Sequence, residues 1–230
     1  MSERGSRLAS LDLWRSVCIA AMCVYHLIYD LALFGLIPAG APDSAACVVL
    51  RSLTGAGFIL LAGVCCRFSG NNILRGLTVL AAGFLVIAAS ILVKNPVQFG
   101  ILQLLGLCMM FYGLAGERLE RLPKAVLPLI CAVLFFLTLW WTNSVTVDIT
   151  WIFPLGFVTE DFYSSDYYPL FPWAFLFLLG TWLGGFLKGK RGKLSLPRAL
   201  TWPGRHSLII YLVHQPVIYG VVYVISRWVV

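Results

Sequence analysis

Charged residues are scarce in this sequence of 230 residues: they make up 12% of it, against 60% for hydrophobic residues. A soluble domain of this length carries about a quarter charged residues. The charges are also excluded from long blocks, since residues 76–93 contain none. An apolar run of about eighteen residues is long enough to cross the hydrocarbon core of a bilayer. The chain is therefore predicted to be an integral membrane protein, because a soluble bundle could not bury so much apolar surface.

Several catalytic motifs are also missing. The sequence has no HExxH helix, no GxSxG elbow and no Walker loop, so zinc proteolysis, serine hydrolysis and ATP-driven transport lack support. Its seven cysteines are scattered, and none has metal-ligand spacing from a histidine. We expect no metal site and no disulfide framework, and interpret the cysteines as small buried hydrophobes.

Seven apolar segments follow one another along the chain, separated by turn and charge signals. They cover residues 11–37, 47–67, 75–93, 98–115, 123–142, 170–187 and 205–229. The first segment is too long and too polar for a cleaved signal peptide. The sequence predicts an all-α integral membrane protein, a bundle of about seven transmembrane helices forming a single domain over residues 1–230.

The basic residues indicate how this bundle is oriented. Thirteen of the seventeen Lys and Arg fall on one side of the expected membrane: Arg4, Arg7, Arg67, Arg75, Arg118, Arg121, Lys124, Lys188, Lys190, Arg191, Lys193, Arg198 and Arg205. Arg15 lies just inside that side, and Arg51, Lys94 and Arg227 fall on the other. The positive-inside rule then predicts a multi-pass protein of the cytoplasmic membrane, with a cytoplasmic N-terminus and an outer C-terminus. The net charge of +7 is explained by topology, and no nucleic-acid partner is expected.

The longest connection, residues 143–169, is expected on the outer side. It has four acidic residues, no Lys or Arg, and many aromatic residues. A loop of this length is usually functional. It is interpreted either as a lid over a polar cavity or as an aromatic anchor at the membrane interface.

The first segment carries ionisable residues along one face of the expected helix. Arg15 and His26 are eleven positions apart, close to three helical turns, and Asp30 follows His26 by four. Asp12 precedes Arg15 by three and is positioned to pair with it. One interpretation is a buried histidine with a snorkelling arginine. The other is a catalytic base, His26, oriented by Asp30, with Arg15 holding an anionic donor. Ionisable groups at membrane depth usually mark a site, which favours the second.

The last segment supplies a second histidine, His214, beside Gln215 and Pro216. A proline at that depth frees a backbone carbonyl, which often lines a polar cavity. His214 is therefore either a catalytic group or a structural histidine bonded across helices. Gln98 and Gln103 in the fourth segment add uncharged polar groups that would face the same cavity.

Four blocks of the sequence resemble one family. The Arg15-x10-His26 spacing is similar to a signature of the type-three membrane acyltransferases. Its wider context, LDLWRSVCIAAMCVYHLIYDL, resembles the heparan-alpha-glucosaminide N-acetyltransferase catalytic-domain family and its bacterial relatives. FGILQLLGL at residues 99–107, DYYPLFPW at 166–173 and GRHSLIIYLVHQPV at 204–217 resemble further blocks of that family in the same order.

The resemblance implies a membrane acyltransferase that modifies glycans. Its donor would be a cytoplasmic acyl-CoA, with an acetyl group expected, and its acceptor an amine or hydroxyl of a glycan or amino sugar on the outer side. Three roles follow: His26, Asp30 and His214 in catalysis; Arg15, Arg75, Arg205, Ser207 and Gln103 in donor binding; Asp166 and Tyr167 in acceptor binding. Besides these ligands and the lipid bilayer, a homodimer is one option for a partner.

The rival function is a proton-coupled transporter or channel, with His26, Asp30 and His214 as a proton relay. Such a protein is expected to contain inverted repeats or paired broken helices. The sequence has no sign of either.

Overall fold

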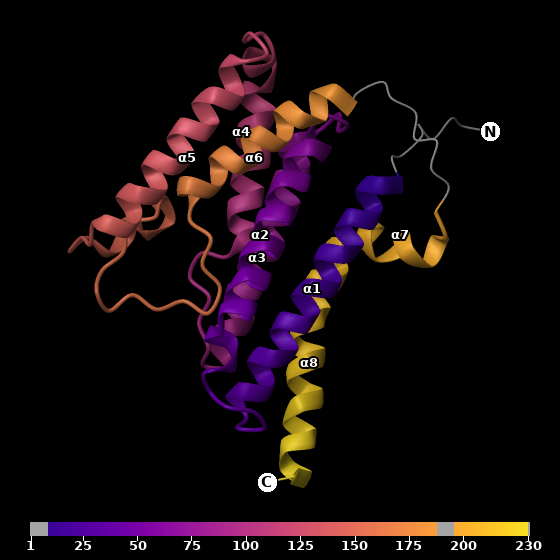
Figure 1. The fold of residues 1–230 in the computed structure, drawn as a ribbon, viewed down its shortest axis with the longest axis vertical. Helices are drawn as coiled ribbons and strands as arrows, with labels where there is room; N and C mark the ends of the chain where they lie inside the picture. Colours follow the sequence, from indigo (N-terminus) through magenta and orange to yellow (C-terminus); the bar gives the residue numbers. More distant parts are fainter. Residues whose placement is uncertain (1–8, 188–195, 230) are drawn as a thin grey trace. The chain divides into compact units, whose positions relative to one another are not determined.

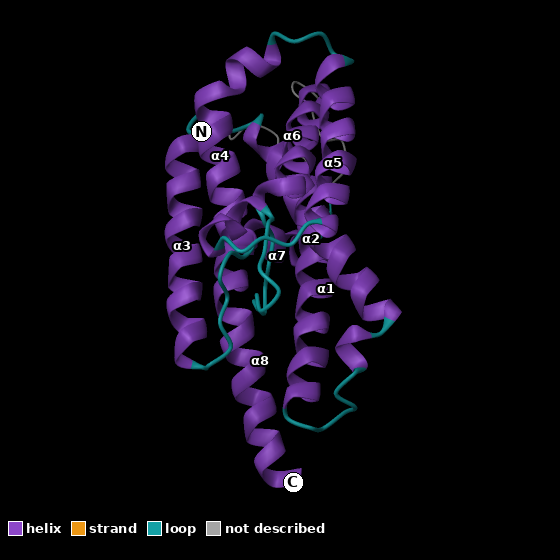
Figure 2. Cartoon of the chain, turned by 90° about the vertical axis from the view of Figure 1, so that its left-hand side faces the viewer, coloured by secondary structure: helices purple, strands orange, loops and turns teal. Residues whose placement is uncertain are grey.

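Helices account for nearly all the regular structure in a computed structural model of the chain, which describes residues 9–187 and 196–229 (Figures 1 and 2). The α-helices are α1 Ala9–Leu33, α2 Ala45–Cys66, α3 Asn72–Leu92, α4 Ile101–Glu120, α5 Val126–Ser144, α6 Leu170–Leu187, α7 Arg198–Arg205 and α8 Ser207–Val229. Two 3₁₀ helices, η1 Ala41–Asp43 and η2 Thr150–Leu155, lie in connections. Each of the seven predicted segments is a helix, which confirms the all-α membrane fold class.

Six of these helices are long and apolar enough to cross a membrane: α1, α2, α3, α5, α6 and α8. The remaining long helix, α4, runs past its apolar part into Glu117, Arg118 and Glu120. Seven crossings, and with them the opposite placement of the two termini, therefore stay a prediction. Among the basic residues used to orient the chain, Arg4, Arg7 and Lys188–Lys193 lie outside the described residues.

The chain divides into two compact units, residues 1–58 with 189–230, and residues 59–188. The first unit contains α1, η1, the first part of α2, α7 and α8. The second contains the end of α2, then α3 to α6. The single domain predicted for residues 1–230 stays a prediction.

In the first unit, α8 runs alongside α1, and the short helix α7 packs against the start of α1 (Figure 1). This contact depends on Gly204, because a Cβ atom there would overlap the backbone carbonyl oxygen of Asp12. Instead, the Gly204 N–H donates to Ser16 Oγ at 2.9 Å, and that hydroxyl donates to the Asp12 carbonyl at 3.0 Å. The chain after α7 is thereby fixed to the first turns of α1.

In the second unit, glycines let helices approach closely, as is common in membrane bundles. Helix α3 lies beside α4 (Figure 2), where a Cβ at Gly76 would be 2.7 Å from the Gly106 carbonyl oxygen. Helices α5 and α6 form a second neighbouring pair (Figure 1). The end of α2 packs on α6, where Gly63 and Gly180 face each other's backbone.

The connection 143–169 is bonded to the α3–α4 connection. Ser165 N–H donates to the Pro96 carbonyl at 3.1 Å, and Tyr168 N–H donates to the Phe99 carbonyl at 2.9 Å. Part of the connection packs on itself, since Phe162 contacts Phe153 and Tyr167. Trp151, by contrast, is 75% exposed. The two interpretations of this connection, lid and interfacial anchor, stay predictions.

Candidate functional site

An arginine pair surrounds Asp12 at the start of α1. The buried Asp12 carboxylate accepts from Arg15 Nη1 at 3.3 Å and from Arg205 Nε at 3.1 Å. The predicted pairing of Asp12 with Arg15 is confirmed. Two of the predicted donor-binding arginines therefore meet on one carboxylate, although they are 190 positions apart in the sequence.

Both guanidinium groups keep accessible surface, because the side chains of Arg15 and Arg205 are 22% and 38% exposed. Ser207, the first residue of α8, follows Arg205 by two positions. Among the described residues, two cations thus share the Asp12 carboxylate. Partly exposed guanidinium groups, each with several N–H donors, are suited to binding a phosphate group.

The two predicted catalytic histidines also meet in the first unit. His26 on α1 and His214 on α8 have ring centroids 5.0 Å apart, with their planes inclined at 59°. His214 is buried and His26 half-buried. Each histidine had a predicted role, but the distance between them could not be predicted, since α1 and α8 are the first and last of the α-helices.

Hydrogen bonding indicates which nitrogen of His214 is available for chemistry. Nδ1 lies 2.7 Å from the Tyr211 carbonyl oxygen, an atom that can only accept, so Nδ1 carries the hydrogen in the neutral ring. The lone pair is then on Nε2. This atom is buried and has no hydrogen-bond partner among the described residues. His214 therefore presents an unoccupied basic nitrogen beside His26.

Asp30 is bonded to α8 and not to His26. Its carboxylate is fully buried and accepts from Gln215 Nε2, at 3.1 Å to one oxygen and 3.2 Å to the other. The expected hydrogen bond from His26 to Asp30 is absent from the described residues, because the carboxylate is directed to the neighbouring helix. Asp30 instead anchors the residue next to His214.

Gln215 is a functional candidate that sequence reasoning did not select. Besides its bonds to Asp30, it has a buried carbonyl oxygen, Oε1, without a partner in the described chain. The signal in the sequence was an amide side chain between His214 and Pro216 in an apolar segment. Its partner, Asp30, could be identified only once α1 and α8 were known to be neighbours.

The other predicted residues lie in the second unit. At the start of α4, Gln103 Oε1 accepts from Gly100 N–H at 3.0 Å and Asp166 Oδ2 accepts from Ile101 N–H at 3.4 Å. Both side chains thus satisfy amides that a helix N-terminus leaves unpaired. Gln103 Nε2 remains buried without a partner among the described residues.

Tyr167 joins this group through a parallel bridge between Phe99 and Tyr167. Its hydroxyl donates to the Phe153 carbonyl at 2.6 Å, and burial raises the pKa of Tyr167 to about 12, so the phenol stays protonated. Arg75 is in the first turn of α3, where its Nη1 donates to Asn72 Oδ1 at 3.4 Å. This is the end of α3 opposite the α3–α4 connection.

Within the described residues, no group of three or more His, Cys, Asp or Glu side chains is arranged to hold a metal ion.

Comparison with known proteins gives one match. The model of the family described as "Heparan-alpha-glucosaminide N-acetyltransferase, catalytic" matches residues 7–216. Searches of curated proteins and of solved structures found no match. The matched range includes both clusters of the first unit, from Asp12 to Gln215, and the start of α4 in the second.

Proposed function

Because the chain belongs to the heparan-alpha-glucosaminide N-acetyltransferase catalytic family, we propose that this multi-pass membrane acetyltransferase uses cytoplasmic acetyl-CoA to acetylate an amine or hydroxyl of a sugar-like acceptor on the outer side. The observation that carries the proposal is the histidine pair on α1 and α8, with an unoccupied basic nitrogen on His214. Two adjacent histidines at membrane depth are expected at a site and not in a lipid-facing scaffold.

The donor is proposed to bind with its phosphates on Arg15 and Arg205. The meeting of the two guanidinium groups at Asp12 supports this, together with the exposed fraction of both side chains. Ser207 would donate its hydroxyl to the same phosphates. Arg75 and Gln103, in the second unit, are proposed as donor-binding residues on the family resemblance alone.

The thin pantetheine arm of CoA then extends along the bundle towards the histidines. Eleven positions separate Arg15 from His26, which is about 16 Å of helix. Such a separation suits a ligand with its phosphates at one end and a thioester at the other. The thioester carbon would reach the histidine pair.

Acyl transfer requires a base for the acceptor. His214 Nε2 takes the proton from the amine or hydroxyl as that atom forms a bond to the thioester carbon. The carbon–sulfur bond breaks, and the same imidazolium returns the proton to the CoA thiolate. His26 either assists this transfer or carries the acetyl group on its own ring between two half-reactions.

Asp30 and Gln215 support this arrangement without touching the reacting atoms. The amide–carboxylate contact fixes α8 to α1 at the residue next to His214. Asp166 and Tyr167 are proposed as acceptor-binding residues on the family resemblance. Their contribution would be carboxylate and phenol oxygens at the start of α4. The family match favours the transferase over the proton-coupled transporter.

Single substitutions test the proposal with acetyl-CoA as donor and glucosamine as probe acceptor. His214→Ala should lower acetyl transfer by roughly 10²–10⁴-fold, the usual contribution of a positioned base, while acetyl-CoA binding is retained. His26→Ala should also lose transfer. His206→Ala is the matched control, because His206 is exposed and bonds locally to the Trp202 carbonyl. Wild-type transfer by both His214→Ala and His26→Ala would refute the assignment.

A second measurement separates the two routes. If His26 carries the acetyl group, wild-type protein incubated with acetyl-CoA alone releases CoA in a stoichiometric burst, and His26→Ala does not. Direct transfer gives no burst in either protein, yet turnover with the acceptor is still lost in His26→Ala.

A further inference from the structure

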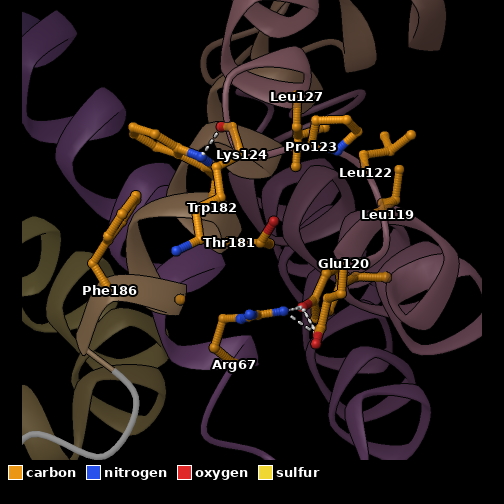
Figure 3. Close-up of a pocket in the computed structure, with 12 residues that line it drawn as sticks. Arg67, Leu119, Glu120, Leu122, Pro123, Lys124, Leu127, Thr181, Trp182 and Phe186 are labelled. Atoms are coloured by element: carbon orange, nitrogen blue, oxygen red, sulfur yellow. Dashed lines mark hydrogen bonds and ion pairs between the residues drawn. The ribbon is translucent and has the colours of Figure 1, made fainter.

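A cavity of about 160 Å³ lies in the second unit, apart from all the residues assigned above (Figure 3). It is formed where helices end or begin: Arg67 follows α2, Glu120 ends α4, Lys124 precedes α5, and Trp182 and Phe186 belong to the last turns of α6. Since α2, α5 and α6 are candidate membrane spans, this position is the level of a membrane interface.

Arg67 is fixed in the wall of the cavity by two partners. Its guanidinium forms an ion pair with Glu120 and donates to the Tyr112 hydroxyl at 3.1 Å (Figure 3). The Tyr112 hydroxyl in turn donates to Glu120 Oε1 at 2.6 Å. Gly185 leaves room for this arrangement, because a Cβ there would be 3.0 Å from Arg67 Nη2. The guanidinium is therefore held in one position before any ligand binds.

The charges of the cavity favour an anion. Among the residues that line the cavity, Arg67 is paired with Glu120, and Lys124 adds a second cation. Arg67 Nε is buried and has no acceptor among the described residues. Buried N–H groups nearly always have a partner. An acceptor oxygen supplied from outside the chain would satisfy this requirement.

The rest of the lining is apolar and aromatic. Trp182 Nε1 donates to the Lys124 carbonyl at 2.7 Å, and leucine side chains and Phe186 complete the wall (Figure 3). The volume is below the 300–1,000 Å³ of pockets that enclose a whole drug-sized ligand. It suits one small charged head group whose apolar part continues outside the cavity. Basic pockets between transmembrane helices bind lipid head groups of this kind.

We propose that this cavity is a binding site for the phosphate of an anionic phospholipid, with Lys124 and Arg67 as its cationic groups. The phosphate oxygens lie towards the Lys124 ammonium and the Arg67 guanidinium, and the acyl chains follow the apolar side by Trp182 and Phe186. This site does not depend on the transferase proposal, because none of its residues has a role in acetyl transfer.

Native mass spectrometry of the full chain, solubilised in detergent, tests the site with phosphatidylglycerol and phosphatidylcholine as probes. The wild-type protein should retain phosphatidylglycerol in preference. Lys124→Gln should weaken this retention on the order of fivefold, because the bound phosphate loses one of its two cationic groups. Arg67→Lys should also weaken it, since an ammonium lacks the planar fork of donors.

Arg121→Gln is the matched control. Arg121 is exposed, lies at the same helix ends and carries the same charge, but does not line the cavity. Its substitution should leave lipid retention unchanged. Equal retention of both lipids by wild type would overturn the proposal, and so would equal losses from Arg121→Gln and Lys124→Gln.

Inorganic phosphate distinguishes two sources of the same ligand chemistry. If added phosphate displaces phosphatidylglycerol, the cavity recognises the phosphate group itself and takes soluble phosphates as well. If it does not, the acyl chains are required, and the ligand is a membrane lipid. Either result supports a phosphate site provided that Lys124→Gln reduces the binding.

Discussion

Substitution of Gly204 tests how the first unit joins its two ends. Gly204 is buried in α7, and a Cβ at this position would overlap the carbonyl oxygen of Asp12 on α1. A backbone oxygen cannot rotate away as a side chain can. In Gly204→Ala, helix α7 must therefore shift from α1, and the contacts of Ser16 and Arg205 move with it.

The size of the effect follows from two known quantities. Inserting a methyl group into a tightly packed contact costs about 1–3 kcal/mol. Gly220 provides the comparison, because it lies in the same unit on α8 and has no atom within 4 Å of its added Cβ. There Gly→Ala should stabilise the helix by about 0.5–1 kcal/mol, since alanine loses less backbone freedom. The two variants should then differ in free energy of unfolding by about 1.5–4 kcal/mol.

Unfolding in detergent, followed by tryptophan fluorescence, gives this difference, and acetyl-CoA binding gives a second readout. Gly204→Ala should be less stable than wild type and bind acetyl-CoA more weakly, because Arg205 leaves Asp12. Gly220→Ala should be as stable as wild type or more so and bind normally. Equal stability of the two variants would refute the close approach of α7 to α1. Normal donor binding by a destabilised Gly204→Ala would instead refute the role of Arg205.

Two further predictions concern the first unit and the topology. Gln215→Leu should destabilise the protein by about 1.5–3 kcal/mol, because the Asp30 carboxylate loses its hydrogen bonds. The double variant Gln215→Leu with Asp30→Leu should recover most of this loss in unfolding experiments. If the effects of the two substitutions add instead, the pairing is contradicted. Labels at Ser164 and after Val230 should be accessible from outside, and a label before α1 only from the cytoplasm. If both ends of the chain are accessible from the same side, the number of crossings is even, and α4 does not cross the membrane.

The fold class was predictable because hydropathy depends on composition alone. Segments without charge over the width of a bilayer form helices, since only then are all backbone groups bonded within the segment. The ends of α4 were less predictable. Its apolar part ends near residue 115, yet the helix continues to Glu120, where Glu120 is paired with Arg67 and Tyr112. Of these two partners, Arg67 is far from Glu120 in the sequence, so spacing alone could not predict its contact.

The candidate site residues were selected from the sequence because ionisable groups are costly inside a membrane. The pairing of Asp12 with Arg15 followed from helical spacing, because both residues are on one helix. The partner of Asp30 could not be predicted from helical spacing. A carboxylate can accept from its own helix or from a neighbouring helix, and spacing does not decide which. Gln215 on α8 is reached only once the packing of α1 and α8 is known.

The four blocks that carry the family resemblance fold into two contacts. The block around Asp12 and Arg15 packs on the block that begins at Gly204, where Arg205 joins the same carboxylate. The block at residues 99–107 lies beside the block at 166–173, through the Phe99–Tyr167 bridge and the Asp166 contact to Ile101. Each contact thus joins polar residues that are distant in sequence and whose neighbours are apolar. In a membrane, where apolar packing alone gives helices little reason to associate, such polar contacts are able to select which helices become neighbours. Residues proposed for the chemistry therefore also form contacts between the segments that hold them.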